Sequence, residues 1–176
     1  MDNSVEKNIK LLAEAKNVKP QNLTACVLQR ERHKKIINEL NRLNVKIKFI
    51  SDGDVSGVIY VIDKESPVDI YIGIGGGPEG VLAAAALSCL GGQMQTRLIL
   101  ENDEVDRAKK MGINNHKKKY NIDDMVKGDV MFCASGVTDG DLVKGIVNNK
   151  NFYEASTYAL HKNSKTEFKI TNTHKK

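Results

Sequence analysis

The sequence predicts an α/β fold in which a mainly parallel β-sheet is flanked by helices. Short apolar runs alternate with stretches of helical spacing along most of the 176 residues, which is the pattern of successive βαβ units. A glycine-rich turn lies between an apolar run and an alanine-rich run, as expected where a parallel strand passes into a helix. We find no internal repeat and no low-complexity linker, so we expect residues 1–176 to form a single α/β domain.

The spacing of apolar residues places the elements of the first half. We expect helices where these residues recur every three or four positions, and strands where they run together or alternate with polar residues. The expected elements are a helix over 5–17, a strand over 23–28, a helix over 31–43, a strand over 45–49, a helix over 55–62 preceded by a capping aspartate, a strand over 69–74 and a helix over 78–90.

The second half continues the alternation and then ends differently. The expected elements are a strand over 97–100, a helix over 103–111, a polar and basic surface loop over 113–121, a strand over 129–134, a helix over 139–147 and a closing hairpin of strands 152–161 and 166–172 with its turn at Asn163 and Ser164.

Composition and charge limit the classes of function. The formal net charge is +5, which suits an anionic ligand, either nucleic acid or a phosphorylated metabolite. The basic loop at 116–119 has only Tyr120 as an aromatic neighbour, so we interpret it as a solvated surface and expect no nucleic-acid partner.

The location is predicted from cysteine usage and from the absence of targeting signals. Cys26, Cys89 and Cys133 all fall in apolar runs without the paired spacing of a metal site, so we expect buried free thiols in a reducing compartment. The sequence contains no run of eighteen apolar residues that could span a membrane. The amino terminus also lacks the charged-then-apolar order of a signal peptide. We expect a cytoplasmic protein without a membrane partner.

The stretch IGIGGGPEG at 72–80 is the strongest local signal. Glycines let backbone amides approach a ligand closely, and a helix start favours anions, so a phosphate can bind on this turn. Glu79, just inside the helix, has two possible roles. It can be a favourable charge at the helix start, or a ligand of a metal ion beside the phosphate.

The same turn also fits a dinucleotide-binding pattern. Gly75, Gly77 and Gly80 satisfy GxGxxG, and Glu101 follows about twenty positions later, near the end of the next expected strand. Against this alternative, Glu79 would place a carboxylate beside a pyrophosphate with no cation between them.

Charged residues follow the carboxyl ends of other expected strands, where open α/β sheets bind ligands. Arg30 and Arg32 flank Glu31 after one strand; they could hold a phosphate together, or each could be a solvated surface arginine. Asp52 and Asp54 flank Gly53 at a helix start, and we expect one to cap that helix and the other to accept hydrogen bonds from sugar hydroxyls. Asp139 and Asp141 suggest the same interpretation with less support.

Taken with their order and spacing, these motifs resemble the carboxyl-terminal half of the class II fructose-1,6-bisphosphatases of GlpX type. The resemblance covers nearly the whole chain, weakens after about residue 160, and is most specific in the long glycine-proline-glutamate segment. The matching segments are 27–33 (VLQRERH), 50–55 (ISDGDV), 72–87 (IGIGGGPEGVLAAAAL), 107–112 (RAKKMG) and 136–145 (GVTDGDLVKG).

The resemblance implies a metal-dependent sugar phosphatase with a fold like that of the inositol phosphatases. Such a hydrolase removes the 1-phosphate of fructose 1,6-bisphosphate in gluconeogenesis, carbohydrate and glycerol metabolism, by attack of a water activated by Mg²⁺ or Mn²⁺. Carried over to this sequence, the family's metal ligand corresponds to Glu79, and its substrate contacts correspond to Arg30, Glu31, Arg32, Asp52, Gly53, Asp54 and Gly76.

Members of the family are about twice as long as 176 residues, and their other metal ligands and catalytic residues lie in an amino-terminal half. We expect that half to be absent here, so that the chain is a fragment or works beside a separate amino-terminal chain, and we expect a homo-oligomer. The alternatives are a phospho-sugar binding module without catalysis or an inactive fragment. Activity toward sedoheptulose bisphosphate is left open.

Overall fold

The computed structural model describes residues 1–101 and 103–176. The helices are α1 (Val5–Ala15), α2 (Lys34–Arg42), α3 (Asp54–Ile59), α4 (Gly77–Leu90), α5 (Asp103–Lys110) and α6 (Ile122–Met125), with short 3₁₀ helices η1 (Pro20–Asn22) and η2 (Glu31–His33). The strands are β1 (Thr24–Leu28), β2 (Lys46–Ile50), β3 (Ile70–Tyr71), β4 (Gln95–Thr96), β5 (Tyr120–Asn121), β6 (Met131–Ser135), β7 (Val147–Asn148), β8 (Phe152–His161) and β9 (Thr166–Lys175).

A parallel sheet of three strands forms the centre of the amino-terminal part, in the order β2-β1-β3. β1 pairs with β2 along its whole length, from Thr24 opposite Lys46 to Leu28 opposite Ile50. All five residues of β1 are buried, as expected for a central strand covered on both faces. Because the strands are parallel, their carboxyl ends lie at one edge of the sheet.

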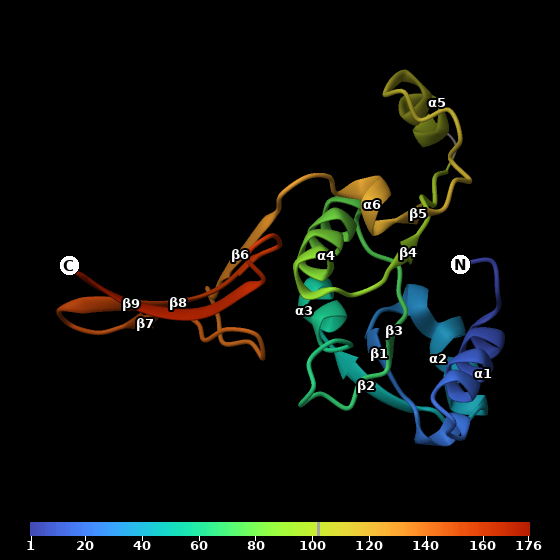
Figure 1. Cartoon of the computed structure of the whole chain (residues 1–176), viewed down its shortest axis with the longest axis horizontal. Helices are drawn as coiled ribbons and strands as arrows, with labels where there is room; N and C mark the ends of the chain where they lie inside the picture. Colours follow the sequence, from blue (N-terminus) through green and yellow to red (C-terminus); the bar gives the residue numbers. More distant parts are fainter. Residues whose placement is uncertain (102) are drawn as a thin grey trace.

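Helices cover both faces of this sheet (Figure 1). Ala25 and Val27 pack with residues of α1 and α2, such as Ile9 and Leu40. Cys26 lies in a second core cluster with Tyr60, at the end of α3. Neighbouring residues of β1 thus contribute to different clusters, because side chains alternate between the faces of a strand.

The alanine-rich helix α4 lies between α3 and an antiparallel sheet formed by β6, β7, β8 and β9. In Figure 1 this sheet extends to the left of the helices. Ala86 of α4 packs with Phe132 of β6 and Leu160 of β8, whereas Ala83 and Leu87 pack with Val58 of α3. These contacts on two sides account for the buried alanines of α4, whereas Val81 and Leu82 of the same helix remain exposed.

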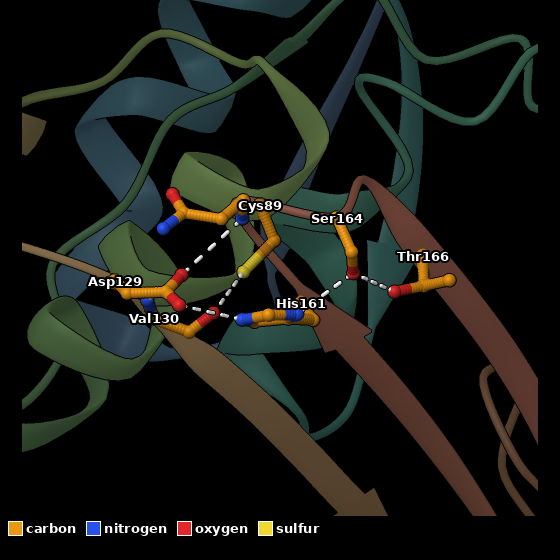
Figure 2. Close-up of polar contacts among 7 residues, drawn as sticks. Cys89, Asp129, Val130, His161, Ser164 and Thr166 are labelled. Carbon is orange, nitrogen blue, oxygen red and sulfur yellow. Dashed lines mark hydrogen bonds and ion pairs between the residues drawn. The ribbon is translucent and has the colours of Figure 1, made fainter.

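The β8–β9 turn is held by a chain of polar contacts, shown in Figure 2. His161 Nε2 lies 2.8 Å from Asp129 Oδ2, and His161 Nδ1 lies 2.8 Å from Ser164 Oγ. Ser164 also contacts Thr166, and Asp129 accepts a hydrogen bond from the backbone N–H of Asn163. The order Asp–His–Ser resembles a catalytic triad, but its groups already have partners within the turn, so we assign it a structural role.

Residues 97–101 and 103–119 form an arm that the two-stranded sheet of β4 and β5 connects to the rest of the chain (Figure 1). Within α5 only Ala108 is buried, and Ile99 is 63% exposed. The prediction of a strand over 97–100 is wrong, because these residues form no strand. The pairing ends at Thr96, and Leu98 to Leu100 have no neighbouring strand to pair with.

Three further expectations need correction. The sheet content is mixed rather than mainly parallel, because β6 to β9 pair only in antiparallel fashion. The helix expected over 139–147 is a closed loop followed by β7, in which Gly140 N–H donates to Val143 O and Gly145 N–H donates to Asp139 Oδ1. Cys133 is exposed and Cys89 only half-buried, whereas Cys26 is buried as expected; all three are free thiols.

The other expected helices and strands agree to within a few residues, apart from the strand over 69–74, of which only Ile70 and Tyr71 form β3. The sequence did not predict β4, β5 or α6, and β5 lies within the stretch 113–121 that was expected to be a loop. The closing hairpin is confirmed, with β9 longer than expected. Among the residues that the structure describes, no helix is both long and apolar enough to cross a bilayer.

Candidate functional site

Three turns meet beyond the carboxyl ends of the parallel strands: 29–33 after β1, 51–54 after β2 and 72–76 after β3. The first and third are joined by Arg32, whose Nε donates to Ile74 O at 2.7 Å. Asp54 links the second turn to the strand and turn that follow: its Oδ1 accepts a hydrogen bond from the Tyr71 hydroxyl of β3 at 3.1 Å, and its other oxygen lies against Gly75. The structure therefore brings the predicted arginine, aspartate and glycine motifs together.

His33 also connects the first turn to the third, and it does so from a buried position. Its side chain is fully buried at 0% exposure. Nδ1 lies 2.7 Å from Leu28 O, and Nε2 accepts a hydrogen bond from the Ile74 N–H at 2.8 Å. Since Nε2 is an acceptor for this amide, the proton is assigned to Nδ1, which donates to the strand carbonyl.

The turn at 51–54 depends on a glycine. Gly53 has φ of 83°, in the left-handed region, and is the residue that precedes α3. Asp52 accepts a hydrogen bond from the Gly53 N–H at 2.9 Å, but no side chain caps α3. The expected aspartate cap is thus wrong, because Gly53 holds the cap position. Ser56 Oγ instead donates to Gly53 O at 2.7 Å.

Asp54 is the best-fixed acidic residue of the three turns. Besides the contact with Tyr71, its carboxylate lies where a Cβ on Gly75 would stand. Burial raises the pKa of the Tyr71 hydroxyl, and the neighbouring Asp54 carboxylate raises it further. Tyr71 therefore stays protonated as the hydrogen-bond donor, and Asp54 is held as the acceptor.

The glycine turn leads into α4 without a side-chain cap. Gly76 precedes the helix in extended conformation, Gly77 is its first residue and Pro78 the second. The carboxylate of Glu79 is exposed and bends back over Gly76, where a Cβ would collide with it. Glu79 makes no hydrogen bond or ion pair with any residue of the described ranges 1–101 and 103–176.

Asp54 and Glu79 could form part of a divalent-cation site. Carboxylate oxygens are the ligand type that Mg²⁺ and Mn²⁺ prefer. The Asp54 carboxylate lies against Gly75, and the Glu79 carboxylate lies against the next residue, Gly76. Within 1–101 and 103–176 no group of three or more His, Cys, Asp or Glu side chains could hold a metal ion. The residues present fit one side of such a site, and the other ligands would have to come from elsewhere.

Arg30 and Glu31 lie on the exposed side of the first turn. Arg30 Nη1 donates to the neighbouring Gln29 O at 3.2 Å, and Glu31 pairs with Lys34 at 3.2 Å. Neither side chain has contacts that fix it as Arg32 is fixed, so both are free to turn toward a ligand.

The second aspartate pair does not join the three turns. Asp139 closes its own loop through Gly145 N–H. Asp141 contacts the Tyr60 hydroxyl, at the far end of α3, and lies 3.7 Å from Lys48 Nζ. The hydrogen bond from Tyr60 holds the pKa of Asp141 below its usual value, and Lys48 acts in the same direction. These residues attach the loop to the helical layer.

Glu101 does not occupy the position that the dinucleotide-binding pattern requires, at the end of a strand. Glu101 lies at the start of the arm, where its N–H donates to the Glu104 carboxylate, and no strand precedes it at 97–100.

In the basic loop, Lys118 pairs with Asp124 at 2.7 Å and Lys119 with Asp2 at 2.6 Å. Two of its lysines are thus engaged within the chain.

Sequence reasoning did not single out His33 and Tyr71 as site residues. His33 directly follows the Arg30–Arg32 motif, which was a signal, but a lone histidine gives no indication of burial. Tyr71 lies inside an apolar strand, where the sequence does not distinguish a core tyrosine from one whose hydroxyl supports a neighbouring aspartate.

Comparison of the sequence with known proteins identifies its family. The family model described as bacterial fructose-1,6-bisphosphatase, glpX-encoded, matches residues 1–174. A fructose-1,6-bisphosphatase class 2 of Haemophilus influenzae is 36% identical over 184 aligned residues, covering 97% of this chain and 55% of the relative.

Two cyanobacterial relatives are named D-fructose 1,6-bisphosphatase class 2/sedoheptulose 1,7-bisphosphatase. The protein of Synechocystis is 35% identical over 160 residues, covering 83% of this chain and 46% of the relative. That of Trichodesmium erythraeum is 31% identical over 188 residues, covering 99% and 54%. The chain spans about half the length of the curated relatives it matches. The match over nearly all residues places this chain in the family of bacterial, glpX-encoded fructose-1,6-bisphosphatases.

Proposed function

We propose that residues 1–176 form the sugar-phosphate-binding half of a class 2 fructose-1,6-bisphosphatase. The reaction is metal-dependent hydrolysis of the 1-phosphate of fructose 1,6-bisphosphate. One observation carries the proposal: Arg32 from the turn after β1, Asp54 from the turn after β2 and Glu79 from the start of α4 all contact residues 74–76 of the glycine turn. A cation, a hydrogen-bond acceptor and a metal-ligating carboxylate at one place suit a phosphorylated sugar.

The basic side chains have the role of binding phosphate. Arg32 uses Nε for Ile74 O, which leaves the two terminal nitrogens of its guanidinium for a phosphate. Arg30, beside it on the same turn, is free to supply a second guanidinium. The uncapped start of α4 at Gly76 adds backbone N–H groups that favour an anion.

The acidic side chains have two roles. We assign Asp52 and Asp54 to the sugar hydroxyls, because both are carboxylates that accept hydrogen bonds and Asp54 is held in place by Tyr71. Glu31, Gly53 and Gly76 complete the proposed contacts. Glu79 is the proposed metal ligand. A bound Mg²⁺ or Mn²⁺ would neutralise charge on the phosphoryl group and activate a water.

The remaining metal ligands must then come from residues outside 1–176, either on the same polypeptide or on a separate chain. The proposal keeps the expectations of a homo-oligomer, of an inositol-phosphatase-like fold and of a cytoplasmic role in gluconeogenesis. One observation favours a second candidate, a phospho-sugar binding module without catalysis. The described ranges offer no cluster of three metal-ligating side chains.

Phosphate release from fructose 1,6-bisphosphate separates the two candidates. We expect residues 1–176 alone to show no measurable turnover, and turnover to appear with Mg²⁺ or Mn²⁺ once the amino-terminal half of a relative is added. Glu79→Gln should abolish the restored activity without unfolding the protein, since a metal ligand is lost. A mixture that binds substrate but stays inactive would support the binding module. Robust turnover by residues 1–176 alone would contradict the division of roles.

A further inference from the structure

The hydrogen bonds that hold the chain after β3 against β1 change from backbone to side-chain partners at the site. Backbone hydrogen bonds join the two strands as far as Ile72, whose N–H donates to Cys26 O at 3.2 Å. Two residues later, the N–H and the C=O of Ile74 are bound by side chains instead. His33 Nε2 accepts from the N–H at 2.8 Å, and Arg32 Nε donates to the C=O at 2.7 Å. Consecutive residues of the first turn thus hold both backbone groups of one residue in the third.

The His33 ring is suited to this position in a way that other side chains are not. It bridges Leu28 O, at the end of β1, and the Ile74 N–H with its two opposite nitrogens, at 2.7 and 2.8 Å. The ring is fully buried, so water cannot take over either contact without rearrangement. Its loss would leave a strand carbonyl and a turn amide without these partners.

Ile74 directly precedes the two glycines on which Asp54 and Glu79 rest. A shift of Ile74 would therefore move Gly75 and Gly76 relative to Arg32, and with them the acidic side chains. His33 itself is buried beneath the turn and has no exposed surface for a ligand.

We propose that His33 is a positioning residue, which fixes the glycine turn so that Arg32, Asp54 and Glu79 face the same phosphorylated ligand. This inference rests on the proposed sugar-phosphate function. His33 acts through Ile74 and does not touch the substrate.

The test compares three variants of the 176-residue chain. His33→Leu keeps bulk and removes both hydrogen bonds. His33→Gln offers an amide oxygen where Nε2 accepts the Ile74 N–H. Leu40→Val alters a buried residue of the adjacent helix α2, away from the turn, and controls for general destabilisation.

Two properties are measured: hydrogen exchange of the Ile74 amide without ligand, and affinity for fructose 1,6-bisphosphate by calorimetric titration. We expect His33→Leu to lose protection of Ile74 and to bind about tenfold more weakly, equivalent to about 1.4 kcal/mol. His33→Gln should recover most of both properties. Leu40→Val should retain affinity while its melting temperature falls.

Each outcome bears on the inference. A folded His33→Leu protein with unchanged Ile74 protection would overturn it, as would equal losses of affinity in His33→Leu and Leu40→Val. If the unaltered chain binds no fructose 1,6-bisphosphate, the proposed function fails and so does the role of His33 in ligand binding. The exchange data would then still decide whether the histidine holds the turn.

Discussion

The carboxylate of Asp54 occupies the space in which a Cβ of residue 75 would stand, so Gly75 is required for close approach rather than for an unusual backbone angle. Gly76 has the same relationship to the carboxylate of Glu79. In contrast, a Cβ on Gly77 or Gly80 would meet no atom within 4 Å. Gly75 and Gly76 thus leave room for acidic side chains, whereas Gly77 and Gly80 do not.

Substitution of the glycines should separate these roles. We expect Gly75→Ala and Gly76→Ala to fold, because the atoms they displace are the ends of side chains, but to bind fructose 1,6-bisphosphate or metal more weakly. Gly80→Ala should raise the free energy of unfolding by about 0.5–1 kcal/mol, since alanine is the better helix former. Denaturant unfolding and calorimetric titration measure the two effects. Normal ligand binding by Gly75→Ala would show that the position of Asp54 is unimportant.

Arg32 should contribute to binding through its charge and through its hydrogen bond to Ile74 O. We expect Arg32→Ala to weaken binding of fructose 1,6-bisphosphate by roughly 1.5–3 kcal/mol, the range for hydrogen bonds to charged groups. Arg42 is a matched control, because it pairs with Glu6 at 2.7 Å on α1 and not with the site. Titration of both variants gives the comparison. Equal affinities for Arg32→Ala and Arg42→Ala would remove Arg32 from the site.

The first ninety residues show how far the sequence predicts this fold. Elements with strong apolar periodicity and clear breakers were placed within a few residues, from α1 to α4. The clustering of the glycine turn with Arg32 and Asp54 also follows from the sequence, because parallel strands bring their carboxyl ends to one edge. The length of β3 was overestimated, since side chains of Arg32 and His33 replace strand pairing at Ile74.

Predictions failed where local pattern and tertiary context disagree. Apolar residues near Ile99 suggested a strand, but strand formation depends on a neighbouring strand, which the arm does not offer. Residues 139–147 have helical spacing, yet the Asp139 side chain binds Gly145 N–H and closes a loop. The burial of His33 could not be predicted, because it depends on two backbone groups far apart in sequence.

Acid should weaken the contact between the loop at 136–145 and the helical layer. The pKa of Asp141 is lowered from its ordinary value of 3.8, chiefly by the Tyr60 hydroxyl and then by Lys48. A lowered pKa in the folded state means that this stabilisation is present above about pH 4 and is lost as the pH falls through the folded value.

Asp141→Asn should therefore lower stability at neutral pH, and its difference from the unaltered chain should shrink below about pH 4. Tyr60→Phe should produce a similar convergence, because it removes the donor. Urea unfolding at a series of pH values measures the difference. A difference that stays constant down to pH 2 would show that the Asp141 charge is not involved.

The cysteines should differ in reactivity. Burial raises the pKa of the Cys26 thiol to about 11, and its side chain is inaccessible. Cys133 is exposed in β6. We expect a thiol reagent at pH 7.5 to modify Cys133 first and Cys26 only on unfolding, because accessible thiolate is the reactive form. Counting of modified thiols by mass spectrometry, with Cys133→Ser as control, checks this. Early modification of Cys26 would contradict its burial.

The central claim is that the three turns beyond β1, β2 and β3 bind one sugar phosphate. Its most direct test is titration of the ¹⁵N-labelled chain with fructose 1,6-bisphosphate, followed through backbone amide resonances. We predict saturable shifts in the segments 30–33, 52–54 and 74–79, and little change at the Asp139–Gly145 loop. No saturable shift, or shifts that gather away from these turns, would contradict the account.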